Sequence, residues 1–95
     1  MGLPEPAVQV VETGRGVYRV QVGEGRSATT HRVEVPAAYP AALGLGEVPV
    51  DELVAASFAF LLEREPSSSI LRRFRLDQIA RYFPEYPAEI ARYLG

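Results

Sequence analysis

Residues 51–83, DELVAASFAFLLEREPSSSILRRFRLDQIARYF, decide the fold of this chain. They contain every phenylalanine of the protein, its longest apolar run and its densest group of arginines. The residues before them have the pattern of a small sheet, and a sheet with one apolar face must bury that face against a second layer. The stretch therefore predicts helices that cover the sheet.

The first of these helices begins at Asp51 and ends before Pro66. Asp51 and Glu52 suit the positive end of a helix dipole, and Pro66 disfavours helical geometry in the residue before it. The apolar side chains form a broad stripe at helical spacing, made up of Leu53, Val54, Phe58, Phe60, Leu61 and Leu62. A helix with so wide a stripe is expected to be buried against the sheet on one side and against another element on the other.

Shorter helices are predicted after Pro66. Ser67–Ser69 offer capping hydroxyls for a helix over residues 70–74, and Asp77 is a cap for a second helix that ends at Pro84. Residues 87–94 predict a final short helix, because Ile90 and Leu94 are spaced i, i+4.

The N-terminal part predicts three strands, over residues 7–13, 17–22 and 28–35, joined by turns that contain glycine. Val20 and Val22 alternate with Arg19 and Gln21, as in a sheet with one solvated face. Residues 1–6 are a lead-in, and residues 36–50 are a connector with room for one helical turn at residues 39–43.

We therefore predict an α+β fold: a three-stranded antiparallel β-meander, one long buried helix and two or three short C-terminal helices. A chain of 95 residues is expected to form a single domain. Its parts are the meander (7–35), the connector (36–50) and the helical part (51–94).

Composition excludes several classes of protein. The absence of cysteine removes disulfide scaffolds, thiolate zinc sites and cysteine nucleophiles. The net charge of −2 argues against a protein that coats nucleic acid with its whole surface. With neither a signal-peptide pattern nor a membrane-length apolar run, the chain is expected in the cytoplasm, with no membrane contact.

The sequence offers little for catalysis. His31 is the one histidine, and we interpret it as a solvent-facing strand residue. The acidic pairs lie at predicted helix ends, and the glycine turns do not match phosphate-binding loops. We therefore expect no enzyme, no catalytic residue, no metal and no cofactor.

Arginine and aromatic residues gather near the C-terminus, and residues 67–95 carry five arginines against three acidic residues. This composition is typical of nucleic-acid contacts and of protein hot spots. It also fits aromatic core residues whose rim is covered by arginine stems. The candidate contacts are Arg72, Arg73, Arg75, Arg81, Tyr82 and Tyr86.

The first functional hypothesis is a non-enzymatic protein-interaction domain, or a homodimer formed through a sheet edge or the apolar helix. The alternative is a nucleic-acid-binding protein that uses the C-terminal helices as a degenerate helix-turn-helix over residues 76–94. Pro84 and Pro87 in the turn, and Arg92 as the one basic residue of the second helix, count against that motif.

The run FLLEREPSSSILRRFRLDQIARYFPEY, residues 60–86, resembles a family of small uncharacterised bacterial proteins. FLLEREP, SILRRF and YFPEY carry the resemblance, which extends to ATTHRVEV at residues 28–35. The resemblance implies a compact domain and brings no assigned function.

Overall fold

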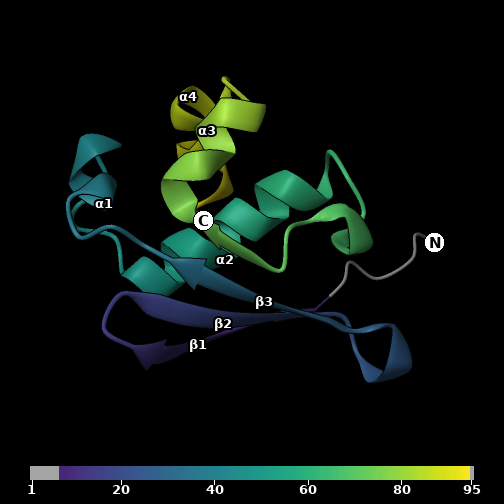
Figure 1. Ribbon diagram of the computed structural model, residues 1–95. Coiled ribbons are helices and arrows are strands. Elements are labelled where there is room, and N and C mark those ends of the chain that lie inside the picture. The colour runs from purple at the N-terminus through teal and green to yellow at the C-terminus, as the bar shows by residue number, and fades with distance from the viewer. Residues whose placement is uncertain (1–6, 95) are drawn as a thin grey trace.

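The computed structural model describes residues 7–94, so the lead-in predicted over residues 1–6 lies outside the described residues. A sheet forms one layer and helices form the other (Figure 1). The strands are β1 (Val8–Gly14), β2 (Val17–Val22), β3 (Thr29–Glu34) and β4 (Arg73–Arg75). The helices are α1 (Tyr39–Ala42), α2 (Val50–Leu62), α3 (Ile79–Tyr82) and α4 (Tyr86–Glu89).

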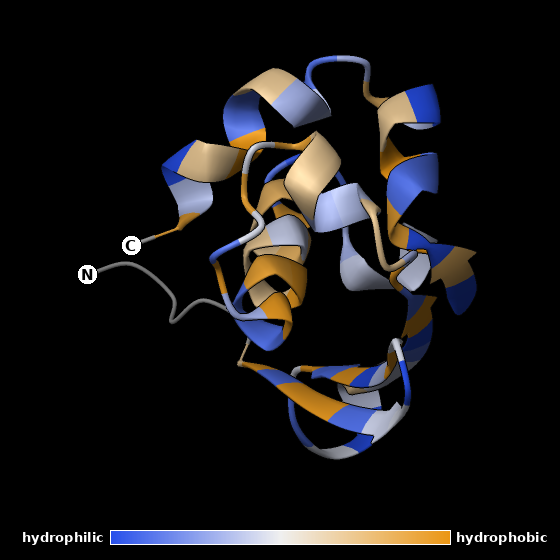
Figure 2. Ribbon diagram, turned by 90° about the vertical axis from the view of Figure 1, so that its left-hand side faces the viewer, coloured by the Kyte–Doolittle hydropathy of each residue, from blue (hydrophilic) through white to orange (hydrophobic). Residues whose placement is uncertain are grey.

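The first three strands form the predicted antiparallel meander. Hydrophobic and hydrophilic bands alternate within the sheet (Figure 2), and along β3 buried and exposed residues alternate strictly. The inner face holds Tyr18, Val20, Val22 and Val33, all buried. The outer face is open to solvent, because the helices cover the inner face (Figure 1).

The sheet has a fourth strand, so the predicted three-stranded antiparallel sheet is wrong in this detail. β4 pairs in parallel with β3, and the Arg32 N–H donates to the Arg72 carbonyl over 2.7 Å. The helix predicted over residues 70–74 does not form. Phe74 points into the core, where its ring centroid lies 5.9 Å from that of Phe58, while Arg73 next to it is exposed. Successive side chains therefore point to opposite faces, as they do in a strand.

Helix α2 is buried on two sides, as its apolar girth predicts. Phe58 faces the sheet, with its ring centroid 5.2 Å from that of His31. Phe60 faces the C-terminal residues and meets the rings of Phe83, Tyr86 and Tyr93 edge-on at 5.1–6.0 Å. Such edge-to-face contacts between rings stabilise the packing of α2 against the C-terminal residues by more than the burial of apolar area alone.

The rest of the helical part consists of shorter pieces than predicted. Three of these pieces are 3₁₀ helices: Ser67–Ser69 precedes β4, Leu76–Gln78 leads into α3, and Ile90–Tyr93 follows α4. The connector contains α1 at the predicted helical turn. Among residues 7–94 there is no helix with the length and apolarity to cross a membrane.

Arg64 joins the end of α2 to these pieces. Its guanidinium lies 3.6 Å from the centre of the Phe60 ring and donates to Glu85 and Glu89 over 3.2 and 3.0 Å. A half-buried arginine that stacks on a ring and pairs with acids from α4 and its cap restrains the C-terminal segment against α2.

A buried hydrogen bond makes the second link between α2 and α4. The Ser57 hydroxyl donates to the Leu53 carbonyl over 2.8 Å, so the Tyr86 hydroxyl donates to Ser57 over 2.7 Å. Both side chains are fully buried, and burial raises the pKa of Tyr86 above its usual value. Tyr86 therefore stays protonated and acts as a donor.

Loss of the Ser57 hydroxyl should destabilise the fold more than loss of the Tyr86 hydroxyl. Ser57→Ala leaves a buried phenol without its acceptor and should lower the free energy of unfolding by about 1–3 kcal/mol. Tyr86→Phe removes the donor and leaves Ser57 bonded to Leu53, so it should lower that free energy by only about 1 kcal/mol. Urea denaturation of both variants measures the difference.

Tyr39→Phe is the matched control, because the Tyr39 hydroxyl is buried and has no hydrogen-bond partner within the described residues. Its removal should leave the stability unchanged or slightly higher. A Tyr86→Phe variant that is less stable than Ser57→Ala would contradict this account.

Candidate functional site

Arginine side chains line up across the outer face of the sheet. Val11 of β1 is paired with Arg19 of β2, Arg19 with Arg32 of β3, and Arg32 with Arg73 of β4. Paired residues of neighbouring strands lie on one face of a sheet. Arg19, Arg32 and Arg73 therefore form a row perpendicular to the strands, which we call the arginine row.

Arg19 and Arg32, the members of this row on the two central strands, form a close pair. The Val35 N–H donates to the Gly16 carbonyl, so Gly16 and Val35 form a hydrogen-bonded pair. Hydrogen-bonded and non-hydrogen-bonded pairs alternate along an antiparallel ladder, and the Arg19–Arg32 pair, three pairs away, is therefore non-hydrogen-bonded. Side chains lie closest together in such pairs, and like charges there destabilise a sheet. Within the described residues none of the three arginines of the row makes an ion pair.

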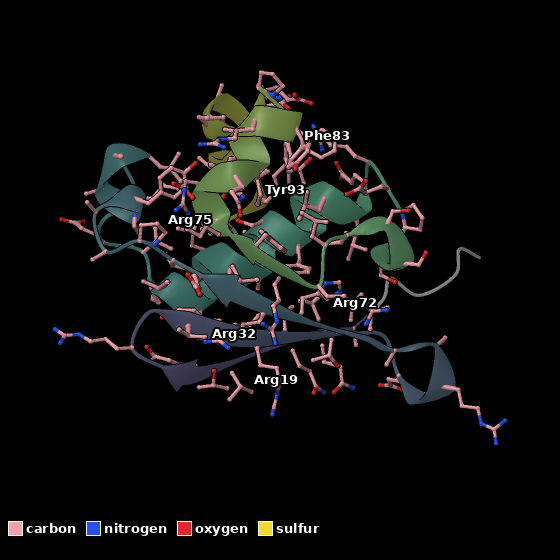
Figure 3. The ribbon with its side chains drawn as sticks, in the orientation of Figure 1. Arg19, Arg32, Arg72, Arg75, Phe83 and Tyr93 are labelled. Carbon is pink, nitrogen blue, oxygen red and sulfur yellow. The ribbon has the colours of Figure 1, made fainter. Side chains whose placement is uncertain are left out.

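A shallow hollow of about 510 Å³ lies over the row. Arg72 adds a fourth guanidinium to its lining, and Thr13 and Thr30 add hydroxyls. Figure 3 shows Arg19, Arg32 and Arg72 at the sheet, far from Phe83 among the helices. Gly14, Val17 and His31 complete the lining, so four guanidinium groups stand around a partly apolar floor, and these groups suit an anion.

His31 lies beneath this hollow, and its predicted exposure to solvent is wrong. Its side chain is 1% exposed and packs on Phe58. The Nδ1–H donates to the Leu71 carbonyl over 2.8 Å, and Nε2 lies 2.9 Å from Thr29 Oγ1, which donates to it when the ring is neutral. The ring thereby ties β3 to the segment that leads into β4.

Burial lowers the pKa of His31 below its usual 6.5; the hydrogen bond that the ring donates to the Leu71 carbonyl opposes this effect, and the positive charge of Arg72 adds to it. The neutral ring is therefore the form that fits the fold. A second positive charge here would also face the arginines of the hollow.

The predicted contact residues separate into different places. Arg73 belongs to the row and Arg72 to its hollow. Arg75, at the end of β4, forms an ion pair with Asp77 at 3.1 Å. Arg81 and Tyr82 are exposed on α3 and are absent from the lining of the hollow.

Tyr86 is the clearest correction among these residues. It is predicted at the surface, but it is fully buried against Phe60 and bonded to Ser57. Its aromatic ring makes it a core residue, because the inner side of α4 has to cover α2.

The sequence-based choice of contacts omits Arg19 and Arg32. The alternation in VYRVQV and HRVEV does place both on the solvent face. Their register, and the fourth strand that adds Arg73, cannot be read from that alternation.

A second surface feature is an apolar groove of about 410 Å³ between β4 and α3. Its lining includes Phe74, Ile79 and Phe83, together with the exposed side chains of Leu71 and Tyr82. Nothing in the structure shows what covers this groove.

Over residues 7–94 the acidic side chains and His31 do not form a cluster of the size that holds a metal ion. Comparisons with family models, with curated proteins and with solved structures give no match to this chain. The resemblance to small bacterial proteins therefore stays a prediction.

Acid should weaken the fold through His31. Because the folded protein has a lowered pKa at this site, the unfolded chain binds a proton more readily, and the free energy of unfolding should fall as the pH drops below the ordinary histidine value of 6.5. Urea denaturation at about pH 7.5 and about pH 5.5 measures this loss for the native chain and for His31→Gln. The native chain should lose more stability between the two pH values, and equal losses would contradict the assignment.

Proposed function

We propose that this chain is a non-enzymatic nucleic-acid-binding domain, and that the outer face of its sheet contacts the phosphate backbone. The observation that carries the proposal is the arginine row, in which like charges are aligned across adjacent strands without acidic partners among the described residues.

Phosphate groups are the natural counter-charge for this row. A guanidinium presents its donors in a planar fork that matches two phosphate oxygens, and such charge-assisted bonds are stronger than neutral ones. A bound phosphate between Arg19 and Arg32 would also relieve their mutual repulsion. The overall charge of −2 means that the attraction is local to this face.

The face offers no aromatic side chain on which a base could stack. Its exposed residues are aliphatic, polar or charged, namely Gln9, Val11, Thr13, Arg19, Thr30, Arg32, Glu34, Arg73 and Arg75. Contacts to phosphate position a protein on nucleic acid and carry no sequence information, so binding should be independent of sequence. The scarcity of apolar anchors makes the face a poorer match for a protein partner.

The helix-turn-helix version of this idea does not fit the structure. The second helix of that motif should lie in the major groove, but here it consists of α4, of four residues, and a 3₁₀ helix. Its basic residue, Arg92, lies 3.7 Å from the Glu89 carboxylate. We therefore place the nucleic-acid contacts on the sheet.

Removal of the arginine row should weaken binding and reduce its salt dependence together. The triple variant Arg19→Gln, Arg32→Gln, Arg73→Gln should bind a labelled oligonucleotide at least about tenfold more weakly, and the slope of log K against log salt should fall by roughly one for each arginine that contacts phosphate. Fluorescence anisotropy across a salt series measures both quantities. Oligonucleotides of unrelated sequence should give the same result.

Arg81→Gln is the control for position, since it removes one guanidinium from the helical layer and should leave affinity and slope unchanged, whereas Arg32→Gln alone removes one from the row and should weaken binding. An Arg81→Gln variant that loses as much affinity as the triple variant would overturn the sheet-face assignment. Displacement of the oligonucleotide by equimolar polyglutamate would point to an acidic protein instead.

A further inference from the structure

Within residues 7–94, β1 (Val8–Gly14, seven residues) is an edge strand that pairs with β2 alone. Such an edge presents unpaired backbone donors and acceptors to any strand that can align with it. The Gly23 N–H donates to the Ala7 carbonyl, which sets the hydrogen-bonding alternation along β1. Residues 9 and 11 therefore bond to β2, and the backbone groups of Val10 and Glu12 point to the open edge.

We propose that two copies of this chain pair through antiparallel β1 strands, with Val11 facing Val11 of the second copy on the two-fold axis. This inference goes beyond the proposed function: the interface is argued from β1 itself, and a longer arginine row is its consequence for that function.

The register follows from the hydrogen-bonding alternation and from the length of the strand. Val11 is the midpoint of Val8–Gly14, so a two-fold axis at Val11 pairs residues 10–12 of the two copies and sets the register shift at Glu12–Gly14 of each copy opposite Val8 and Gln9 of the other. In that register Val10 of one copy exchanges backbone hydrogen bonds with Glu12 of the other, and these are residues whose groups point outward. A two-fold axis at Gln9 or Thr13 would leave much of the strand unpaired.

The side chain of Val11 supports the same axis. It is 48% exposed, one of the large exposed apolar residues of the described chain, and it lies on the outer face beside Arg19. At a non-hydrogen-bonded pair the two valines approach closely and cover one another. β-branched side chains are favoured in such cross-strand contacts.

Pairing through β1 would place the arginine rows of both copies on the same face of one twisted, eight-stranded sheet. Neighbouring strands are ~4.8 Å apart, so Arg19 and its counterpart would be about 14 Å apart, beyond the Debye length at physiological salt. Along the sheet, the path from Arg73 of one copy to Arg73 of the other would be roughly 34 Å long. Duplex DNA carries roughly 20 charges over that length. The second copy thus extends the phosphate-binding face.

Oligomeric state without nucleic acid tests the inference separately from the proposed function. Multi-angle light scattering should give a dimer for the native chain and for Gln9→Lys, and a monomer for Val11→Lys, whose dissociation constant should rise at least about tenfold. Gln9→Lys adds the same charge to the same face of β1, but away from the axis. Circular dichroism melts confirm that both variants are folded.

A cysteine substitution tests the register, since the chain has no other cysteine. Val11→Cys should form a disulfide-linked dimer under mild oxidation, because residues at a non-hydrogen-bonded antiparallel pair have the Cα spacing that a disulfide needs. Gln9→Cys should cross-link much more slowly, as its counterpart would be four residues further along the strand.

A native chain that stays monomeric at several times the concentration used for binding would overturn the dimer, while the arginine row could still bind nucleic acid. A dimer that Val11→Lys leaves intact would overturn the β1 interface. A dimer with the expected cross-link and no affinity for nucleic acid would keep the interface and overturn the proposed function.

Discussion

The parallel pairing of β4 with β3 is the constraint on which the rest of this structure depends. It is short, three residues on each strand, yet it carries the chain from the helical layer back to the sheet. Phe74 reaches Phe58 on the inner face, and Arg73 joins Arg32 on the outer face. One strand thus completes both the core and the candidate site.

Two neighbouring contacts hold this short strand in place. His31 binds the carbonyl of Leu71 just before β4, and the Gln78 side chain accepts from the Arg75 N–H at its end over 2.7 Å. Beyond β4 the short helices need little stability of their own, because Phe60, Arg64 and Ser57 of the α2 region fix them by stacking, ion pairs and a buried hydrogen bond. Tertiary packing commonly supplies the stability of such short helices.

The sequence predicts those parts of the fold that follow from local periodicity. The meander, the turn at α1 and the two-sided burial of α2 all follow from alternation, glycines and the apolar girth of residues 53–62. The strand at Arg73–Arg75 does not follow from periodicity, since a segment of three residues is too short to distinguish a helical turn from an edge strand. What decides it is a non-local contact, the packing of Phe74 on Phe58. The burial of His31 could have been predicted from the sequence, because in a strand His31 lies on the same face as the inward-facing Val33.

The candidate site shows the same division between local and non-local information. Local alternation places Arg19 and Arg32 in solvent, but only strand register brings them beside Arg73. An NMR titration of the arginine Nε–Hε resonances with a short oligonucleotide at low salt tests the central claim most directly. The account predicts that Arg19, Arg32 and Arg73 shift and that Arg81 does not. Shifts confined to Arg81 and its neighbours on α3, or no shifts at all, would contradict it.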